Sequence, residues 1–320
     1  MKPPRVGLAV LPTPLVRAPR LETALGAGPL FIKRDDLTGF ALSGNKARPL
    51  EFLLGDAIDK GCDVVVAAGG PSSNFCAAAA VAACVVGIDC DLLFPGDPPS
   101  ARSANIEMAR AAGARVVFGA ARTRDELDDA VVEHARTLTA SGRSPYAVPR
   151  GGATPVGALG FFYAAQELGE QCDAAGIAVR TVVVPTGSGG TQSGLLAGQV
   201  GLGMAWQVIG ASVSRPAEGL AEQILGAART CAAALGCTPP TPGDVDVRDV
   251  RGSGFGIASA QDRVSTDLAL RHEGLLLDRY YGAKAMTLFR ALLAGGTPTP
   301  AVFWHSGGVA SAVTALVEGA

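Results

Sequence analysis

The sequence predicts an α/β protein with two lobes, each built on a mainly parallel, twisted sheet flanked by helices. Three observations lead to this fold class. Short valine-rich runs alternate with longer stretches rich in alanine and leucine. Each apolar run is only about four to six residues long, as expected for a buried strand that a covering helix follows. The chain has 320 residues and holds more of these strand–helix pairs than one ordinary sheet needs.

The first pair is a strand over residues 63–68 (DVVVAA) and a helix over residues 75–86. Further strands are expected at 90–94, 115–118, 180–185, 207–211 and 301–304, and the helices that follow them at 101–112, 125–141, 191–199, 216–235 and 309–317. Right-handed crossovers join parallel strands in this order. The segment 239–256, rich in proline and glycine, is expected to form a loop near a cleft.

Composition excludes several classes of protein. Hydrophobic residues make up 48% of the chain and charged residues 18%, which indicates a globular protein. The net charge of −2 and the lack of a basic block argue against a nucleic-acid partner. The longest apolar run, residues 75–88, is shorter than the roughly 18–20 residues of a bilayer span, so no membrane association is expected.

The cysteines and histidines indicate the cellular compartment and bear on whether the protein binds a metal. Seven cysteines occur without a C-x-x-C pair, and the N-terminus has no convincing secretory signal, which together predict reduced thiols in the cytoplasm. The three histidines do not stand at metal-ligand spacing, so no metal site is expected.

Lysine is rare in this chain, and one lysine stands at an unusual place. Arginine accounts for 22 of the 27 basic residues, yet Lys46 occurs in the turn of SGNKARPLEFLL, just before an apolar helix. It is either a solvated charge at the start of that helix or an amine that must lose its proton and attack a carbonyl. Arginine cannot do the second.

Two strand-to-helix junctions are rich in glycine and hydroxyl groups: AAGGPSSNF at 67–75 and VPTGSGGTQSG at 184–194. Such junctions lie at the carboxyl ends of parallel strands, where helix N-termini attract anions. The second junction fails the dinucleotide pattern G-x-G-x-x-G because Gln192 holds the third position, and no P-loop motif occurs. A small monophosphate is therefore predicted there, and the alternative is a tight turn with packing glycines.

A deprotonatable lysine, a phosphate cradle and two α/β lobes together favour pyridoxal phosphate as the cofactor. At this point the sequence resembles the D-cysteine desulfhydrase and 1-aminocyclopropane-1-carboxylate deaminase group, which has the tryptophan-synthase-β type of pyridoxal-phosphate fold. The matching stretches run from about residue 11 to residue 317: FIKRDDLTGFALSGNKARPLEFLLGDA, GGPSSN, PRGGATPVGALGF, PTGSGGTQSG, GSGFGI, EGLLLDRYYGAKAM and FWHSGG.

The resemblance implies a role for each matched residue. Lys46 would carry the cofactor covalently and later move the α-proton of the substrate. Asn74 would bind the phenolic oxygen, and Ser306 would face the pyridine nitrogen. Ser73 and Tyr281 would act on the substrate side in proton transfer or binding. The phosphate would be held by Gly187, Ser188, Gly189, Gly190 and Thr191.

The resemblance also bears on domains and partners. We expect a larger domain of residues 1–45 plus 155–320, a smaller domain of residues 46–154, and the active site in the cleft between them. A small amino acid is the expected substrate, and a homodimer is implied.

The pattern breaks at three positions. Phe75 stands where the family has histidine or glutamine, Phe255 replaces a tyrosine in GFG, and Gly282 replaces the glutamate of the deaminases. Phe75 and Phe255 make the expected substrate pocket more apolar. Without the glutamate, a hydroxyl such as that of Ser306 would meet a neutral ring, which is a weaker electron sink.

The sequence therefore predicts a lyase that performs α,β-elimination on a small, cysteine-like amino acid and gives a 2-oxo acid and ammonia. Ring opening of the cyclopropane amino acid, β-replacement and racemisation are the alternatives on the same scaffold. A non-catalytic relative that only binds the cofactor is the alternative from a different class.

Several residues also have purely structural explanations. Ser73 could cap the following helix, and Tyr281 could be core packing. Lys284 is expected to be a solvated helix charge, and Lys33 is expected to pair with Asp35 or Asp36.

Overall fold

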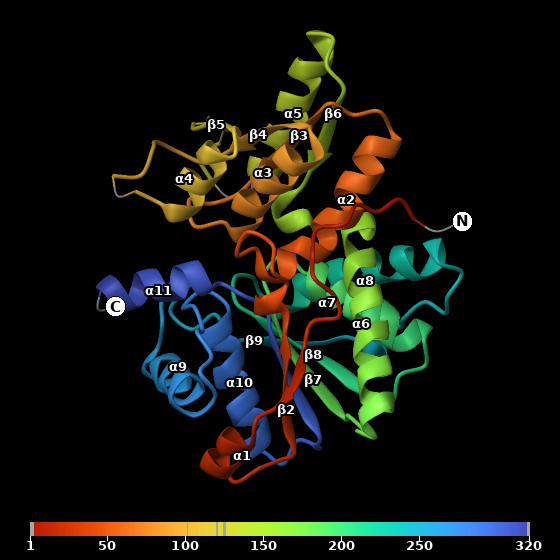
Figure 1. Ribbon diagram of the computed structural model, residues 1–320, viewed down its shortest axis with the longest axis vertical. Coiled ribbons are helices and arrows are strands. Elements are labelled where there is room, and N and C mark those ends of the chain that lie inside the picture. Colours follow the sequence, from red (N-terminus) through yellow and green to blue (C-terminus); the bar gives the residue numbers. More distant parts are fainter. Residues whose placement is uncertain (1–2, 101, 120, 124–125, 319–320) are drawn as a thin grey trace. The chain divides into compact units, whose positions relative to one another are not determined.

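Two separate sheets organise the chain in the computed structural model, which describes residues 3–100, 102–119, 121–123 and 126–318 (Figure 1). Contacts divide the chain into a larger unit, Val10–Asn45 with Phe161–Ala320, and a smaller unit, Met1–Ala9 with Lys46–Gly160. Residues 3–9 thus group with the smaller unit, whereas the sequence prediction placed them in the larger domain. The reason is visible in residues 5–9, because Arg5 and the backbone N–H groups of Leu8 and Ala9 all bind the Glu51 carboxylate.

The larger unit is built on a six-stranded sheet in the order β1-β2-β10-β7-β8-β9. Its strands are β1 (Leu15–Arg17), β2 (Leu30–Arg34), β7 (Thr181–Thr186), β8 (Gln207–Ser212), β9 (Asp246–Asp249) and β10 (Ala301–His305). Every neighbouring pair is parallel except β1 with β2. This confirms the mainly parallel sheet that the sequence predicts.

The helices of the larger unit, among the described residues, are α1 (Pro19–Leu25), α6 (Pro155–Ala175, which begins in the smaller unit), α7 (Gly190–Gly201), α8 (Ala217–Ala234), α9 (Ala260–Glu273), α10 (Gly282–Ala294) and α11 (Val309–Glu318). Alternate strand residues face opposite layers. Val183 and Phe303 pack in the core with α1, α9 and α10. Val182 and Trp304 pack in the other core, with α6 and α7.

The smaller unit has a four-stranded, fully parallel sheet in the order β5-β4-β3-β6. Its strands are β3 (Val64–Ala68), β4 (Asp89–Leu93), β5 (Arg115–Val117) and β6 (Pro145–Val148), and its helices are α2 (Ala47–Asp59), α3 (Asn74–Val86), α4 (Ala104–Ala111) and α5 (Glu126–Ala140). Leu127 and Val131 of α5 pack on Val66 and Leu93 of the sheet. Ala101 and Asp125, predicted as the first residues of two helices, lie outside the described residues.

One predicted loop is partly wrong. The segment 239–256 contains β9, an edge strand with the sequence DVRD. An edge strand pairs on one side only and needs little apolar sequence, so composition did not reveal it.

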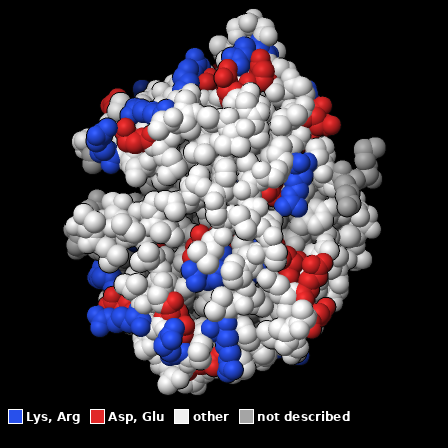
Figure 2. Space-filling model, viewed as in Figure 1, with Lys and Arg blue, Asp and Glu red and all other residues white. Residues whose placement is uncertain are grey.

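The surface and the helices agree with the charge and hydropathy of the sequence. Figure 2 shows basic side chains beside acidic ones on the visible face. Among the described residues, no helix has the length and apolar composition of a bilayer span. Nor do His, Cys, Asp and Glu gather there in groups of three or more that could hold a metal ion.

Candidate active site

The loops predicted to carry chemistry in the larger unit lie at one edge of its sheet. Strands β2, β10, β7 and β8 run parallel, so their carboxyl ends share an edge. The loop after β7 begins at Gly187 and leads into α7. The loop after β10 begins at Ser306. Ligands of parallel sheets bind at this kind of edge.

The N-terminus of α7 is open to an anion. Gly189 caps the helix with φ 92°, and no side chain caps it. A Cβ on Gly189 would lie 2.9 Å from the Ile224 side chain, so glycine is required for both space and conformation. The amides of Gly190, Thr191 and Gln192 have no acceptor among the described residues, as expected for a first helical turn. Three free N–H groups and the helix dipole fit a phosphate.

Asn45 ties the lysine turn to both loops. Its backbone N–H donates to the carbonyl oxygen of Ser306 at 2.8 Å. Its side-chain Nδ2 donates to Thr191 Oγ1 at 3.1 Å. Gly44 lies so close that a Cβ there would be 2.4 Å from the Ser306 oxygen. The residue that precedes Lys46 is therefore fixed against the start of α7 and the end of β10.

Lys46 ends the short 3-10 turn Gly44–Lys46 and is half-buried. Desolvation lowers the pKa of its amine from 10.5 to about 8. Its Nζ has no hydrogen bond or ion pair among the described residues, whereas Lys33, Lys60 and Lys284 all donate. Burial without a partner favours the neutral amine, which is the nucleophilic form.

One prediction about the other lysines is wrong, and one stays a prediction. The fully buried Nζ of Lys33 donates to Glu167, Gln171 and the Thr13 carbonyl oxygen, and its expected pairing with Asp35 or Asp36 stays a prediction. Lys284 is not solvated: it is 1% exposed and donates to two carbonyl oxygens. Sequence spacing could not reveal these partners, which come from distant parts of the chain.

Tyr281 stands beside the loop that follows β7. It immediately precedes α10 and is half-buried. A Cβ on Gly187 would lie 2.9 Å from Cε1 of the Tyr281 ring, so ring and loop are in close contact. Phe255 packs edge-on against the same ring, with centroids 5.5 Å apart. The aromatic residues thus lie next to the candidate phosphate loop within the larger unit.

Asp278 holds the backbone of Tyr281 in place. Its carboxylate accepts from the N–H groups of Tyr280, Tyr281 and Gly282. Burial raises the pKa of Asp278 to about 6, although these three donors oppose the shift. The carboxylate replaces a side-chain cap at the start of α10.

The remaining residues of this edge are Ser306, His305 and Gly282. The hydroxyl of Ser306 is half-buried and has no partner among the described residues. Desolvation lowers the pKa of His305 to about 4, and its Nδ1 accepts from the Gly307 N–H, which makes it a structural acceptor. A Cβ on Gly282 would lie 3.2 Å from Leu277, so the glycine is also a packing choice.

The smaller unit places Ser73, Asn74 and Phe75 at the start of α3, after β3. Ser73 Oγ accepts from the Cys76 N–H, so it does cap the helix. Asn74 Oδ1 accepts from Asn105 Nδ2 at 3.1 Å, which leaves the Asn74 Nδ2 free to donate elsewhere. Phe75 is 3% exposed and packs against Gly152. Its place in a substrate pocket stays a prediction.

Three residues of this region were missed in the sequence. Asn45 stood inside the SGNK turn, and only the lysine drew notice. Asp278 precedes a helix by four residues, a recognisable capping position. Asn105 carries no local signal, because its partner Asn74 is 31 residues away in the chain.

Comparisons with known proteins agree with this geometry. A family model described as "Pyridoxal-phosphate dependent enzyme" matches residues 6–307. A D-cysteine desulfhydrase of Klebsiella pneumoniae subsp. pneumoniae is 34% identical, with 95% of this chain and 94% of that protein covered. A Pyrococcus abyssi protein, named provisionally as a 1-aminocyclopropane-1-carboxylate deaminase, is also 34% identical, with coverage of 96% and 92%.

Solved structures extend the similarity to the fold. The crystal structure of an ACC deaminase homologue superposes with a TM-score of 0.91 at 31% identity and covers 98% of this chain and 95% of that one. The free amides of α7 and the unpaired amine of Lys46 fit a cofactor with one phosphate and one aldehyde. The chain belongs to the family of pyridoxal-phosphate-dependent enzymes.

Proposed function

We propose that this enzyme is a lyase that performs α,β-elimination on a small, cysteine-like amino acid. The observation that carries the proposal is the state of Lys46. Its amine is unpaired among the described residues, and its pKa is lowered to about 8. It follows directly after Asn45, which binds Thr191 at the candidate phosphate site.

Each residue has a defined task in this proposal. Pyridoxal phosphate, when bound, supplies an aldehyde for the substrate amine and a ring that accepts electron density from Cα. The α7 amides and the loop Gly187–Thr191 would hold the phosphate, and Lys46 would hold the aldehyde carbon. Asn74 would donate to the phenolic oxygen through its free Nδ2. Ser306 would hydrogen-bond the ring nitrogen.

The proposed reaction removes a proton from Cα and a leaving group from Cβ. The neutral Lys46 amine would take the proton from Cα of the substrate. The β-substituent leaves with its bonding electron pair, and water then releases a 2-oxo acid and ammonia. Tyr281 and Ser73 are proposed to bind the substrate or to move protons on its other side. General acid–base help of this kind contributes about 10²–10⁴ in rate.

Elimination is favoured over ring opening by Gly282. Gly282 carries no carboxylate of its own, and a hydroxyl such as that of Ser306 does not protonate the ring. A weaker electron sink suits a good leaving group at Cβ. The similar relatives include both a D-cysteine desulfhydrase and a protein named for the cyclopropane amino acid, so 1-aminocyclopropane-1-carboxylate deamination is the second candidate.

A substrate panel tests the proposal. The protein is incubated with pyridoxal phosphate and D-cysteine, L-cysteine, β-chloroalanine or 1-aminocyclopropane-1-carboxylate, and 2-oxo acid, ammonia and free thiol are measured. We expect oxo acid from a β-substituted substrate, and loss of that activity in Lys46→Ala by at least the acid–base factor of about 10². Oxo acid from the cyclopropane substrate alone would favour the second candidate. No product from any substrate would leave only a binding function.

We also propose the assembly and the location of the protein. A homodimer is supported by apolar residues of α11 that are exposed in the single chain, with Leu316 at 59% and Val317 at 83%. A cytoplasmic location is supported by the seven cysteines, which form no disulfide. Sedimentation equilibrium would give the mass of the assembly.

A further inference from the structure

The loop from Arg251 to Ile257 is rich in glycine and carries one large aromatic side chain. Gly252, Gly254 and Gly256 have φ values of 56°, 142° and 78°. A chain with so many left-handed positions has little conformational preference of its own. Phe255, at the centre of the loop, is 37% exposed and therefore available to a ligand.

Phe255 is part of an aromatic wall, which we define as Phe255, Tyr280 and Tyr281. The ring centroid of Phe255 lies 5.3 Å from that of Tyr280 and 5.5 Å from that of Tyr281. Gly256 lies against the Tyr280 ring, because a Cβ there would be 2.6 Å from Cε1. The wall continues to Gly187 through Tyr281, so it borders the candidate phosphate loop.

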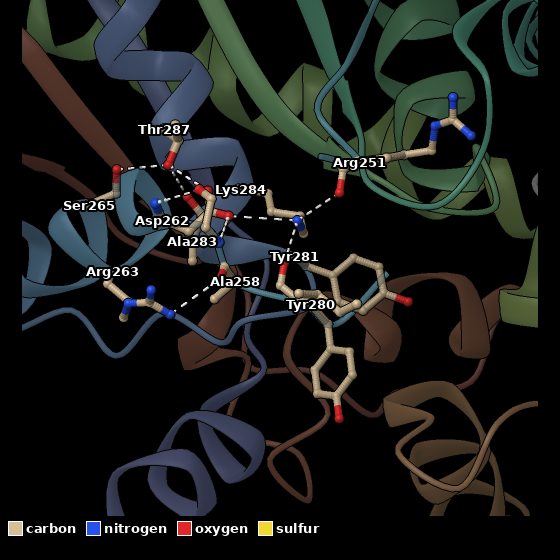
Figure 3. A network of polar contacts seen from close by, with 12 residues as sticks. Arg251, Ala258, Asp262, Arg263, Ser265, Tyr280, Tyr281, Ala283, Lys284 and Thr287 are labelled. Carbon is tan, nitrogen blue, oxygen red and sulfur yellow. Dashed lines mark hydrogen bonds and ion pairs between the residues drawn. The ribbon is translucent and has the colours of Figure 1, made fainter. Parts of the chain in front are cut away.

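Lys284 fastens both ends of this loop. Its Nζ donates to the carbonyl oxygen of Arg251 at 2.9 Å and to that of Ile257 at 2.8 Å (Figure 3). The same Nζ lies 3.6 Å from Asp262 Oδ2. Lys284 is 1% exposed and Asp262 is 4% exposed, so the charged group is buried together with its partner.

The position of Lys284 links the loop to Tyr281. Lys284 stands three residues after Tyr281, in the first turn of α10. One helix start therefore carries the tyrosine and the amine that holds the loop. A buried charge is costly, and an apolar residue of similar size is often as stable. The charge is explained by the two carbonyl oxygens it holds, which a packing residue would leave without a donor.

We infer that Lys284 is a positioning residue that holds the loop 251–257 so that Phe255 completes the aromatic wall, and that this wall selects substrates with an apolar β-substituent. The inference rests on the proposed function for the identity of the site. It assigns no contact of Lys284 with substrate or cofactor.

Two measurements on the holoenzyme test the inference, and neither needs turnover. The first is hydrogen exchange of the amides of residues 252–257. The second is the equilibrium binding of two α-methyl amino acids, α-methyl-S-methylcysteine and α-methylserine, followed by cofactor absorbance. Neither ligand has an α-proton, so neither can be eliminated. The ratio of their dissociation constants measures the preference of the aromatic wall for an apolar β-substituent over a hydroxyl.

The variants form a graded series with a matched control. Lys284→Met removes both donors at nearly constant length, and Lys284→Gln keeps a shorter donor, which preserves the test should the first variant not fold. Thr287→Val is the control, because Thr287 bonds Asp262 and Ser265 in the same network but touches no loop residue. Phe255→Tyr adds a hydroxyl to the aromatic wall and leaves the hydrogen bonds from Lys284 to the loop unchanged.

We expect loop exchange to accelerate at least tenfold in Lys284→Met, less in Lys284→Gln, and not in Thr287→Val. The preference for the S-methyl ligand should fall about tenfold in Lys284→Met and in Phe255→Tyr, the size of a discrimination by one apolar group. Unchanged exchange in both Lys284 variants would overturn the inference. An unchanged binding ratio in both Lys284→Met and Phe255→Tyr would overturn it too. Failure of the proposed function would appear separately, as wild-type binding of these ligands without turnover of any substrate.

Discussion

At the scale of the residue, identical side chains do different work because their surroundings differ. Lys33 and Lys284 are buried with several acceptors each, and Lys60 is exposed beside Asp56. Among the described residues, Lys46 is the one lysine whose amine is buried without a hydrogen-bond acceptor, and burial lowers its pKa to about 8. The sequence singled out Lys46 by its turn and by the scarcity of lysine, but only the structure separates it physically from the others.

The lowered pKa of Lys46 predicts how fast the apoenzyme binds pyridoxal phosphate covalently. Only the neutral amine attacks the aldehyde, and about one tenth of a group with pKa 8 is neutral at pH 7. The rate should rise about tenfold from pH 6 to pH 7 and level off above pH 8. Covalent attachment is followed by absorbance after mixing. A rate that still rises tenfold per unit beyond pH 9 would show an ordinary lysine.

At the scale of the element, a few close backbone contacts set the site more than any helix or strand does. Gly44 and Gly307 approach so closely that either would lose the contact if it carried a side chain. Asp278 orders the start of α10, and Asn45 orders the start of the lysine turn. The contacts of Gly44 and Asn45 join residues that are distant in the sequence, so motifs located the loops without showing what holds them.

Gly44→Ala should damage cofactor binding, and Gly26→Ala should not. Both glycines are left-handed, with φ 55° and 61°, so alanine costs about 1–2 kcal/mol of stability at either position. A Cβ at Gly26 meets nothing within 4 Å, whereas at Gly44 it meets the Ser306 carbonyl oxygen at 2.4 Å. We expect at least tenfold weaker pyridoxal-phosphate binding in Gly44→Ala only, measured by equilibrium titration. Equal affinity in the two variants would contradict the role of this contact.

At the scale of the whole molecule, valine-rich strands were the reliable signal. The predicted strands at 63–68, 180–185 and 301–304 correspond to β3, β7 and β10, and the fold class is confirmed. The helices α1, α6 and α9 went unpredicted, and α10 was expected only as a helix around Lys284. Gly160 of α6 lets the helix pack closely, because a Cβ there would lie 2.4 Å from the Arg48 carbonyl oxygen.

Some residues of the candidate site could be predicted from local sequence patterns, and others could not. Glycine and hydroxyl patterns predicted Gly187–Thr191 as a phosphate site, which stays a prediction. Among the described residues the amides of Gly190, Thr191 and Gln192 have no acceptor. Asn105 was missed and Lys284 was misread, because their burial and pairing depend on tertiary contacts that no local spacing records. Asp278 was missed although its partners are local.

The central claim is that one amine, that of Lys46, carries the cofactor. Borohydride reduction of the protein after addition of pyridoxal phosphate, followed by digestion and mass spectrometry, tests it most directly. The five lysines of the chain are separated by arginine and can be told apart by peptide. The account predicts a single reduced pyridoxyl group on the peptide that contains Lys46. A group on any other lysine at equal yield, or none at all, would contradict it.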